Sequence, residues 1–265
     1  MRRVHFVELE DLDWMPGAIR DGGTDLLDTF FGLVKFYQPL VDVLERAIDA
    51  SGGQQVVDLC SGGGGGALFM ARALAARGRT DVRFLLTDRH PNEATIGRTR
   101  GLANVAVHGE PVDAMHVPSD LRGLRTMFGA LHHFPPEAIH SLLADAVASG
   151  AHVAFFDVAA NPMMRKMPAP LSPFALLPNA LVLFTLPFAL VPLVRPVRAS
   201  RWLLTYLVPL IPFLFAWDGT VSALRAYAPE ELLDIARGVP GTERYAWASE
   251  KGGMGLYLTG RPKAS

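Results

Sequence analysis

Five consecutive glycines follow an apolar segment that contains one acid, in Val56-Val57-Asp58-Leu59-Cys60-Ser61 and then Gly62 to Gly66. The apolar segment predicts a strand, and the pattern of residues 67–76 directly after the glycines predicts a helix. Five glycines together are costly in backbone entropy. A tight turn that lets a ligand lie against bare backbone explains them better than a flexible linker, because ordered elements are expected on both sides. The sequence therefore predicts a ligand-binding loop.

Two kinds of nucleotide ligand compete for this loop. Gly62-x-Gly64-x-x-Ala67 matches the dinucleotide fingerprint, which places a pyrophosphate at a helix N-terminus. Asp58, four residues before Gly62, favours a different ligand, because a carboxylate there can face the amino group of an amino acid while the glycines accommodate an adenosine.

Acidic residues also follow the next two expected strands. Asp88 ends the segment 84–88, where a carboxylate can accept both hydroxyls of a ribose; a helix cap or turn is the alternative role. Asp113 follows the third strand and a loop, where it can accept an adenine amino group while Met115 packs on the ring. Three acidic strand ends in this order make a stronger signal than any one of them.

The surrounding elements predict the sheet that positions these residues. Short apolar runs at 56–59, 82–86, 105–107, 127–131 and 153–156 alternate with helical stretches such as 67–76 and 136–148. This alternation is typical of a parallel sheet covered on both faces, in which ligands bind at the carboxyl ends of the strands.

The two ends of the chain complete the expected architecture. We expect an irregular segment over residues 1–23, helices from Thr24 and after Pro39, and a helix from Pro229 to about Gly238. Two last strands, 245–248 and 255–258, are expected to form an antiparallel hairpin at the sheet edge.

On these motifs the chain resembles the class I S-adenosylmethionine (SAM)-dependent methyltransferases, whose acidic-x-Gly-x-Gly-x-Gly motif corresponds to Asp58 through Gly64. Cys60 stands where that family usually has its first glycine. More specifically, the chain is similar to a set of bacterial methyltransferase-like proteins of largely undefined substrate. That similarity rests on Asp11-Leu12-Asp13-Trp14-Met15-Pro16 with Arg20, on Asp58–Gly64, on Phe128–Phe134 and on Trp217-Asp218-Gly219.

The resemblance implies an α/β fold with a Rossmann-like class I methyltransferase sheet, mostly parallel with an antiparallel last strand, N-terminal helices and an apolar helical insertion. It implies SAM as cofactor and S-adenosylhomocysteine as product. The expected cofactor-binding residues are Asp58, Cys60, Ser61, Gly62, Gly63, Gly64, Asp88, Arg89, Asp113, Ala114 and Met115. A reactive thiol near a helix N-terminus is the alternative role for Cys60.

Four residues are candidates for catalysis. His132 and His133 follow the fourth strand, where a histidine can remove a proton from a hydroxyl or amine; wall or loop packing is the alternative. Asp157 and Asp218 are alternative bases or substrate anchors, or else solvated or capping groups. In-line placement matters most for methyl transfer, so a strong base need not be required. The histidines do not cluster with acids, so no metal is expected.

Residues 161–227 form an expected insertion, with no charged residue between Met167 and Val194 or between Trp202 and Trp217. The first stretch is long enough to span a bilayer. Its prolines, and the arginines at 195, 198 and 201, argue against spanning. A lid over the substrate pocket, a homodimer interface and a surface-seated hairpin that contacts lipid remain open. We therefore expect residues 1–53 to form a helical cap on the substrate side and residues 54–160 and 228–265 to form the SAM-binding domain.

Composition bounds the function further. The net charge of −1 gives no basic field for nucleic acid, and a single cysteine suits a reducing cytoplasm. No apolar signal core follows Met1-Arg2-Arg3, so a cytoplasmic location, peripheral at the inner membrane face, is expected. The sequence predicts methyl transfer to an oxygen, or else a nitrogen or carbon, of a small apolar or lipid-like acceptor. A membrane-associated SAM-binding protein without catalysis and an NAD(P)-dependent oxidoreductase are the alternatives.

Overall fold

A computed structural model describes residues 6–12, 14–91, 93–160 and 172–263. Its residues form two compact units. The sheet unit is drawn from residues 36–159 and 227–265, and the helical unit from residues 1–35 and 160–226. Residues 36–53, which the sequence grouped with the N-terminal cap, belong with the sheet. Asp13 of the N-terminal motif and residues 161–171 of the predicted insertion lie outside the described residues.

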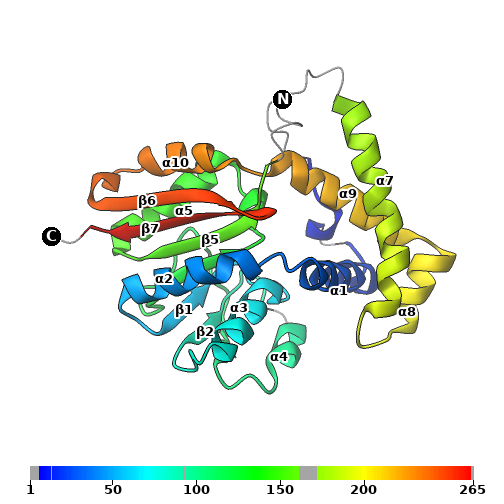
Figure 1. Cartoon of the computed structure of the whole chain (residues 1–265), viewed down its shortest axis with the longest axis horizontal. Helices are drawn as coiled ribbons and strands as arrows, with labels where there is room; N and C mark the ends of the chain where they lie inside the picture. Colours follow the sequence, from blue (N-terminus) through cyan, green and yellow to red (C-terminus); the bar gives the residue numbers. More distant parts are fainter. Residues whose placement is uncertain (1–5, 13, 92, 161–171, 264–265) are drawn as a thin grey trace. The chain divides into compact units, whose positions relative to one another are not determined.

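The sheet unit contains a seven-stranded sheet in the order β3-β2-β1-β4-β5-β7-β6 (Figure 1). Its strands are β1 (Gln55–Asp58), β2 (Arg83–Leu86), β3 (Val105–Val107), β4 (Leu124–Phe128), β5 (Val153–Val158), β6 (Tyr245–Gly252) and β7 (Gly255–Pro262). The first five pair in parallel, whereas β7 is antiparallel to both β5 and β6. The predicted fold class, a mostly parallel sheet with an antiparallel ending, is confirmed.

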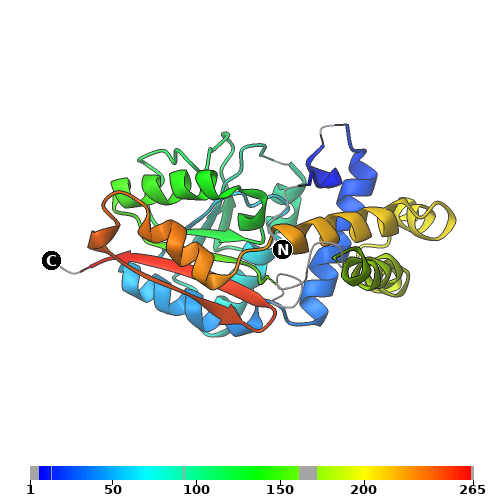
Figure 2. The same ribbon diagram turned by 90° about the horizontal axis from the view of Figure 1, so that it is seen from above.

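Helices cover this sheet. They are α2 (Val41–Ser51), α3 (Gly65–Ala76), α4 (Glu93–Thr99), α5 (Pro136–Ser149) and α10 (Pro229–Arg237), with short 3₁₀ turns η2 (Gln38–Leu40), η3 (Leu131–His133) and η7 (Thr242–Arg244). Figure 2 shows α5 (green) and α2 (blue) on opposite sides of the sheet.

Strand alternation explains how one layer of the core forms. Val57, Met127 and Phe155 lie on three neighbouring strands and are completely buried. They belong to one cluster with Leu142 of α5 and Leu232 of α10. Burying such side chains away from water is the main source of stability for a sheet covered on both faces.

Two elements of the sheet unit differ from expectation. β4 was predicted at 127–131 but runs from Leu124 to Phe128. Gly129, with φ of +67°, ends it, and Leu131 is buried in the following turn, so its apolar side chain had mimicked a strand residue. Helix α4 was not predicted, because it has only seven residues and a weak apolar pattern.

The helical unit contains η1 (Leu9–Asp11), α1 (Gly17–Leu33), α7 (Ser172–Leu190), η5 (Val191–Leu193), α8 (Ala199–Trp202), the π-helical turn η6 (Leu203–Leu207) and α9 (Leu210–Arg225). Its core gathers Leu26, Leu190, Val191, Val194, Ile211 and Phe215. The expected irregular segment through Gly22-Gly23 is wrong, because α1 starts at Gly17. A Cβ at Gly22 would lie 2.4 Å from Ile211, so glycine allows α1 to approach α9 closely.

One stretch of the helical unit, Leu176–Leu193, is long and apolar enough to cross a membrane by length and composition, with a mean hydropathy of 2.0. Residues Ala199–Leu207 and Leu210–Arg225 meet the same criterion only as a bent pair, with 79° between their axes.

Candidate functional site

Asp58 ends the central strand β1 with its carboxylate completely buried. The Ser61 hydroxyl donates to Asp58 Oδ2 at 2.6 Å, and the Thr126 hydroxyl of β4 donates to Asp58 Oδ1 at 2.8 Å. Burial raises the pKa of Asp58 to about 7, although both hydroxyl bonds lower it and nearby Asp88 raises it further. A cationic partner close to Asp58 would therefore favour the ionised form of this carboxyl group.

Asp88 follows β2 and holds the glycine loop. The backbone N–H of Gly62 donates to Asp88 Oδ2 and that of His90 to Asp88 Oδ1, both at 2.8 Å. The N–H of Val112 donates to the Asp88 carbonyl at 2.9 Å, which ties the third acidic segment to the same edge of the sheet. The bond from the His90 N–H fits the turn role foreseen for Asp88, and acceptance of ribose hydroxyls stays a prediction.

The Asp113 segment forms a turn beside this edge. Asp113 Oδ1 accepts the N–H of Met115 at 2.9 Å, and the Asp113 carbonyl accepts the N–H of His116 at 3.0 Å. Ala114 is buried and Met115 is half-buried against the core, whereas Arg89 is exposed. The structure therefore places Asp113 and Met115 near Asp88 and leaves Arg89 at the surface.

Cys60 lies among the three carboxylates. Its pKa is raised to about 12, first by burial and then by Asp88, Asp58 and Asp113. A thiol with this pKa stays protonated at neutral pH and is a poor nucleophile, which argues against the reactive-thiol alternative. Cys60 also has φ of +54°, the left-handed region where glycine is favoured.

The glycine loop turns β1 into α3. Gly62 and Gly64 have φ of +48° and +80°, so both use conformations that side chains disfavour. A Cβ at Gly66 would lie 2.4 Å from the Cβ of Phe128, so this glycine admits β4 against the first turn of α3. The Gly63 carbonyl accepts a weak hydrogen bond from the Arg98 guanidinium at 3.4 Å.

Three threonines in this site were missed by sequence reasoning. Thr126 bonds the Asp58 carboxylate, the Thr87 hydroxyl donates to the Asp58 carbonyl at 2.8 Å, and the Thr95 hydroxyl of α4 donates to the Gly62 carbonyl at 2.7 Å. Thr87 stands next to Asp88 at a strand end, which was an available signal. Thr126 and Thr95 depend on the position of β4 and the existence of α4, which the sequence pattern did not give.

His132 and Asp157 form a buried pair after neighbouring strands β4 and β5. Asp157 Oδ1 lies 2.8 Å from His132 Nδ1, and Asp157 Oδ2 accepts the His132 backbone N–H at 2.6 Å. Asp157 Oδ1 also accepts the N–H of Val158 at 2.6 Å. An ionised carboxylate can only accept, so the contact between Asp157 Oδ1 and His132 Nδ1 favours a proton on Nδ1 and an unprotonated Nε2.

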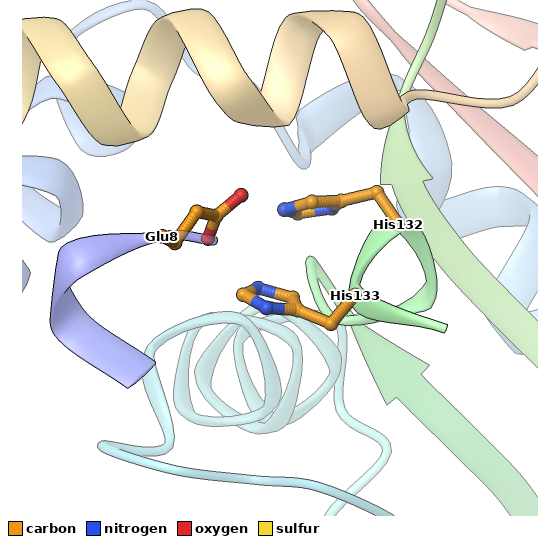
Figure 3. A group of neighbouring side chains, drawn as sticks. All are labelled: Glu8, His132 and His133. Atoms are coloured by element: carbon orange, nitrogen blue, oxygen red, sulfur yellow. The ribbon is translucent and has the colours of Figure 1, made fainter. Parts of the chain in front are cut away.

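His133 projects from the same turn, η3, and its ring lies beside that of His132 (Figure 3). The two ring centroids are 4.4 Å apart with planes tilted by 36°. The turn is itself held, because the Tyr227 hydroxyl donates to the Phe134 carbonyl at 2.7 Å. Of the two candidate histidines, the structure shows His132 paired with Asp157 of the sheet unit.

Asp218, the fourth catalytic candidate, belongs to α9 of the helical unit. Its oxygens accept the backbone N–H groups of Leu9 at 2.7 Å and Glu10 at 3.1 Å. Burial raises the pKa of Asp218 to about 6, the two N–H bonds lower it, and Glu8 and Asp11 raise it. These contacts support the capping alternative for Asp218, because both oxygens hold the start of η1.

A groove of about 550 Å³ lies at the opposite edge of the sheet unit. Its lining includes Arg46, Leu124, His152, Trp247 and Arg261. Leu124 and Val153, also in the lining, are the first residues of β4 and β5. Ligands of such sheets bind at the carboxyl ends of the strands, so this groove is not the site of the three carboxylates.

The comparisons with solved structures identify the fold. Human N-acetylserotonin methyltransferase in complex with SAM matches with a TM-score of 0.51 and 12% identity, over 92% of this chain and 57% of that one. NcsB1, an O-methyltransferase from neocarzinostatin biosynthesis in complex with SAM and 2-hydroxy-5-methyl naphthoic acid, matches with 0.51 and 13%, over 93% and 59%. No protein-family model matches the chain, and no curated protein does.

The chain therefore has the class I SAM-dependent methyltransferase fold. It spans less than three-fifths of the length of these two structures.

The backbone at Cys60 gives a testable prediction. Cys60→Gly and Cys60→Ala both remove the sulfur, but only glycine relieves the left-handed conformation. We expect the glycine variant to exceed the alanine variant by about 1 kcal/mol in free energy of unfolding. Urea denaturation followed by circular dichroism measures the difference; an alanine variant that is equally stable would contradict the strain.

The raised pKa of Asp58 predicts a pH dependence of stability. Between pH 4 and pH 7 the folded carboxyl keeps a proton that the unfolded chain loses, so stability falls as pH rises through this window. From pH 5 to pH 7 the wild type should lose roughly 2–3 kcal/mol more unfolding free energy than Asp58→Asn, which cannot ionise. Parallel pH profiles from urea denaturation would refute this if the two proteins kept a constant difference.

Proposed function

We propose that this chain is a SAM-dependent methyltransferase that methylates an oxygen of a small apolar or lipid-like acceptor, with nitrogen or carbon acceptors as the alternatives. The observation that carries the proposal is the convergence of Asp58, Asp88 and Asp113 around the glycine loop. Asp58 and Asp88 repel one another, and the basic side chain described beside Asp113 is the exposed His116, at 3.9 Å. A ligand with an ammonium group and several hydrogen-bond donors would relieve this repulsion.

The residues of the loop fit SAM in a specific way. Asp58 would face the ammonium group, and its raised pKa would fall when that charge arrives. Asp88 would accept the ribose hydroxyls with the lone pairs that Gly62 and His90 do not use, and Asp113 would accept the adenine amino group with Met115 against the ring. Gly62 and Gly64 leave bare backbone beside these groups. When bound, SAM supplies an electrophilic methyl group on a sulfonium.

His132 would act as the base. Asp157 fixes the imidazole through Nδ1, and the unprotonated Nε2 would take the proton of an acceptor hydroxyl. His132 would take the proton onto Nε2 and leave the electron pair of the O–H bond on the acceptor oxygen. That oxygen would bond to the methyl carbon while the sulfur–methyl bond breaks with its electron pair on sulfur, so that S-adenosylhomocysteine leaves. Asp157 would stabilise the resulting imidazolium. His133 would contribute to the wall of the site.

The apolar character of the acceptor has separate support. NcsB1, one of the two structures of the same fold, was solved with a naphthoic acid that carries a hydroxyl. In the present chain, residues 167–194 carry no charge. They belong to the insertion that follows β5, the strand that contains Asp157, the partner of the proposed base His132. A cytoplasmic location and a homodimer are predictions that go with this function.

Binding of SAM is the first prediction of the proposal. We expect calorimetry to detect SAM binding with release of a proton near pH 6, because the ammonium group favours ionised Asp58. Asp58→Ala should weaken binding by at least about 100-fold, as expected when a buried charge partner is lost. The matched control is Asp234→Ala, an exposed carboxylate on α10.

The same titration with NAD separates the oxidoreductase alternative. Binding of NAD without SAM would favour that alternative. If the folded protein bound neither, the methyltransferase proposal would be wrong.

Kinetics test the base. In a labelled-methyl assay with apolar hydroxylated aromatics and lipids as acceptors, His132→Gln should lower kcat by about 10²–10⁴-fold with SAM affinity unchanged. Asp157→Asn should lower kcat by up to about 10⁴-fold and shift the pH profile, since the carboxylate both orients the imidazole and stabilises its protonated form. His133→Gln is the control and should retain most activity. SAM binding with no methylated product from any acceptor class would favour a binding protein without catalysis.

A further inference from the structure

Exposed apolar side chains concentrate on the helical unit. Of 21 exposed large hydrophobic residues in the described chain, 13 lie between Leu177 and Trp217. Of the residues in the apolar stretch Leu176–Leu193, only 17% are buried, whereas the core helix of a soluble protein is mostly buried. Contiguous apolar surface of this kind marks a contact with another molecule or with a membrane.

The densest part is the apolar tip, which we define as residues 202–210. The tip carries Trp202, Leu203, Tyr206, Leu207, Val208 and Leu210 as exposed apolar side chains, and it has no charged residue. Leu207 is the most exposed of all, at 74%. Phe213, one turn further along α9, extends the same surface.

The tip is firmly built. The rings of Trp202 and Tyr206 stack at 5.1 Å, and the Tyr206 hydroxyl donates to the Phe188 carbonyl of α7 at 2.6 Å. Just before the tip, Arg201 is buried, pairs with Asp25 of α1 and donates to the Pro196 carbonyl at 3.0 Å. These contacts hold the apolar side chains outward on a structured turn.

The sequence that contains the tip is rich in basic residues. From Val158 to Trp217 the sequence contains no aspartate or glutamate and five basic residues, Arg165, Lys166, Arg195, Arg198 and Arg201. Arg195 is exposed, and its guanidinium donates only to the carbonyls of Pro192 and Val194 within the described chain. Arg198 is half-exposed, 3.7 Å from Asp21 and Asp25.

We propose that the apolar tip docks into one leaflet of an anionic phospholipid membrane. Leu203, Leu207 and Val208 would enter the acyl region, and Trp202 and Tyr206 would lie at its boundary, where amphipathic rings are favoured. Arg195 would meet lipid phosphates. The inference rests on the helical unit alone and does not depend on methyl transfer.

Two other arrangements fit these observations less well. In a symmetric dimer through the tip, the same patch meets itself, so Arg195 of one copy would lie near Arg195 of the other, and its described contacts are with carbonyls and not with an acid. In a spanning hairpin, Arg195 and Arg198 would have to cross the bilayer, and Pro178 and Pro187 inside α7 would each remove a backbone hydrogen bond in lipid. Seating in the interface avoids both costs.

Vesicle flotation of the purified full chain tests the inference. The vesicles contain phosphatidylcholine alone or a mixture with phosphatidylglycerol. We expect flotation with the mixture, weakened at least about tenfold by Leu207→Asp, since a carboxylate in the tip would oppose insertion. Leu33→Asp, at an equally apolar and 57% exposed site at the end of α1, is the matched control and should float like the wild type. Quenching of Trp202 by brominated lipid, absent in Trp202→Phe, reports insertion directly.

Each other outcome would overturn the inference. The inference is wrong if the wild type floats with neither kind of vesicle, or if Leu207→Asp floats as well as the wild type. The role of anionic lipid is refuted if the wild type floats equally well without phosphatidylglycerol. It is also refuted if Arg195→Gln keeps the preference of the wild type for vesicles that contain phosphatidylglycerol. Sedimentation that showed a wild-type dimer dissociated by Leu207→Asp would assign the tip to a second copy. SAM binding is also measured for Leu207→Asp, so that a failure of membrane docking can be told apart from a failure of the proposed function.

Discussion

The site depends on one electrostatic problem, the buried carboxylate of Asp58. Its removal from water opposes ionisation more strongly than the hydroxyls of Ser61 and Thr126 favour it. Those hydroxyls come from the glycine loop and from β4, so the carboxylate connects the two segments that meet at the centre of the sheet. A buried charge with partial compensation is costly for stability and is well suited to binding a cation.

The strand order explains why chemistry can gather beside this charge. The chain moves outward from β1 through β2 to β3, and then returns to add β4 and β5 on the other side of β1. The crevice of such a sheet opens where the order reverses, between β1 and β4. Asp58, Asp88 and Asp113 follow the first set of strands, whereas His132 and Asp157 follow the second. The topology thus separates the groups proposed to hold the donor from those proposed to move a proton.

What the sequence could predict was local. The strand, glycines and helix around Asp58 are contiguous, Asp88 lies two residues after its strand, and Asp113 follows its strand after a short loop, so short patterns sufficed for them. The pairing of His132 with Asp157 and the bond from Thr126 to Asp58 were not predictable, because they require the register of β4 against its neighbours. Gly22-Gly23 was misinterpreted for a similar reason. These glycines are needed because Ile211 and Leu214, which are distant in sequence, pack where a Cβ would otherwise lie.

The two units handle apolar residues in opposite ways. In the sheet unit, the side chains of Val57, Met127 and Phe155 are completely enclosed, as hydrophobic burial requires. In the helical unit, a small core around Leu26 and Ile211 leaves most of α7 uncovered. An apolar surface that is held in place by an ion pair such as Arg201–Asp25, and that follows the exposed Arg195 in sequence, is difficult to explain as unfinished packing. It is explained if the partner that completes this surface is itself apolar within and negatively charged at its boundary, as a phospholipid leaflet is.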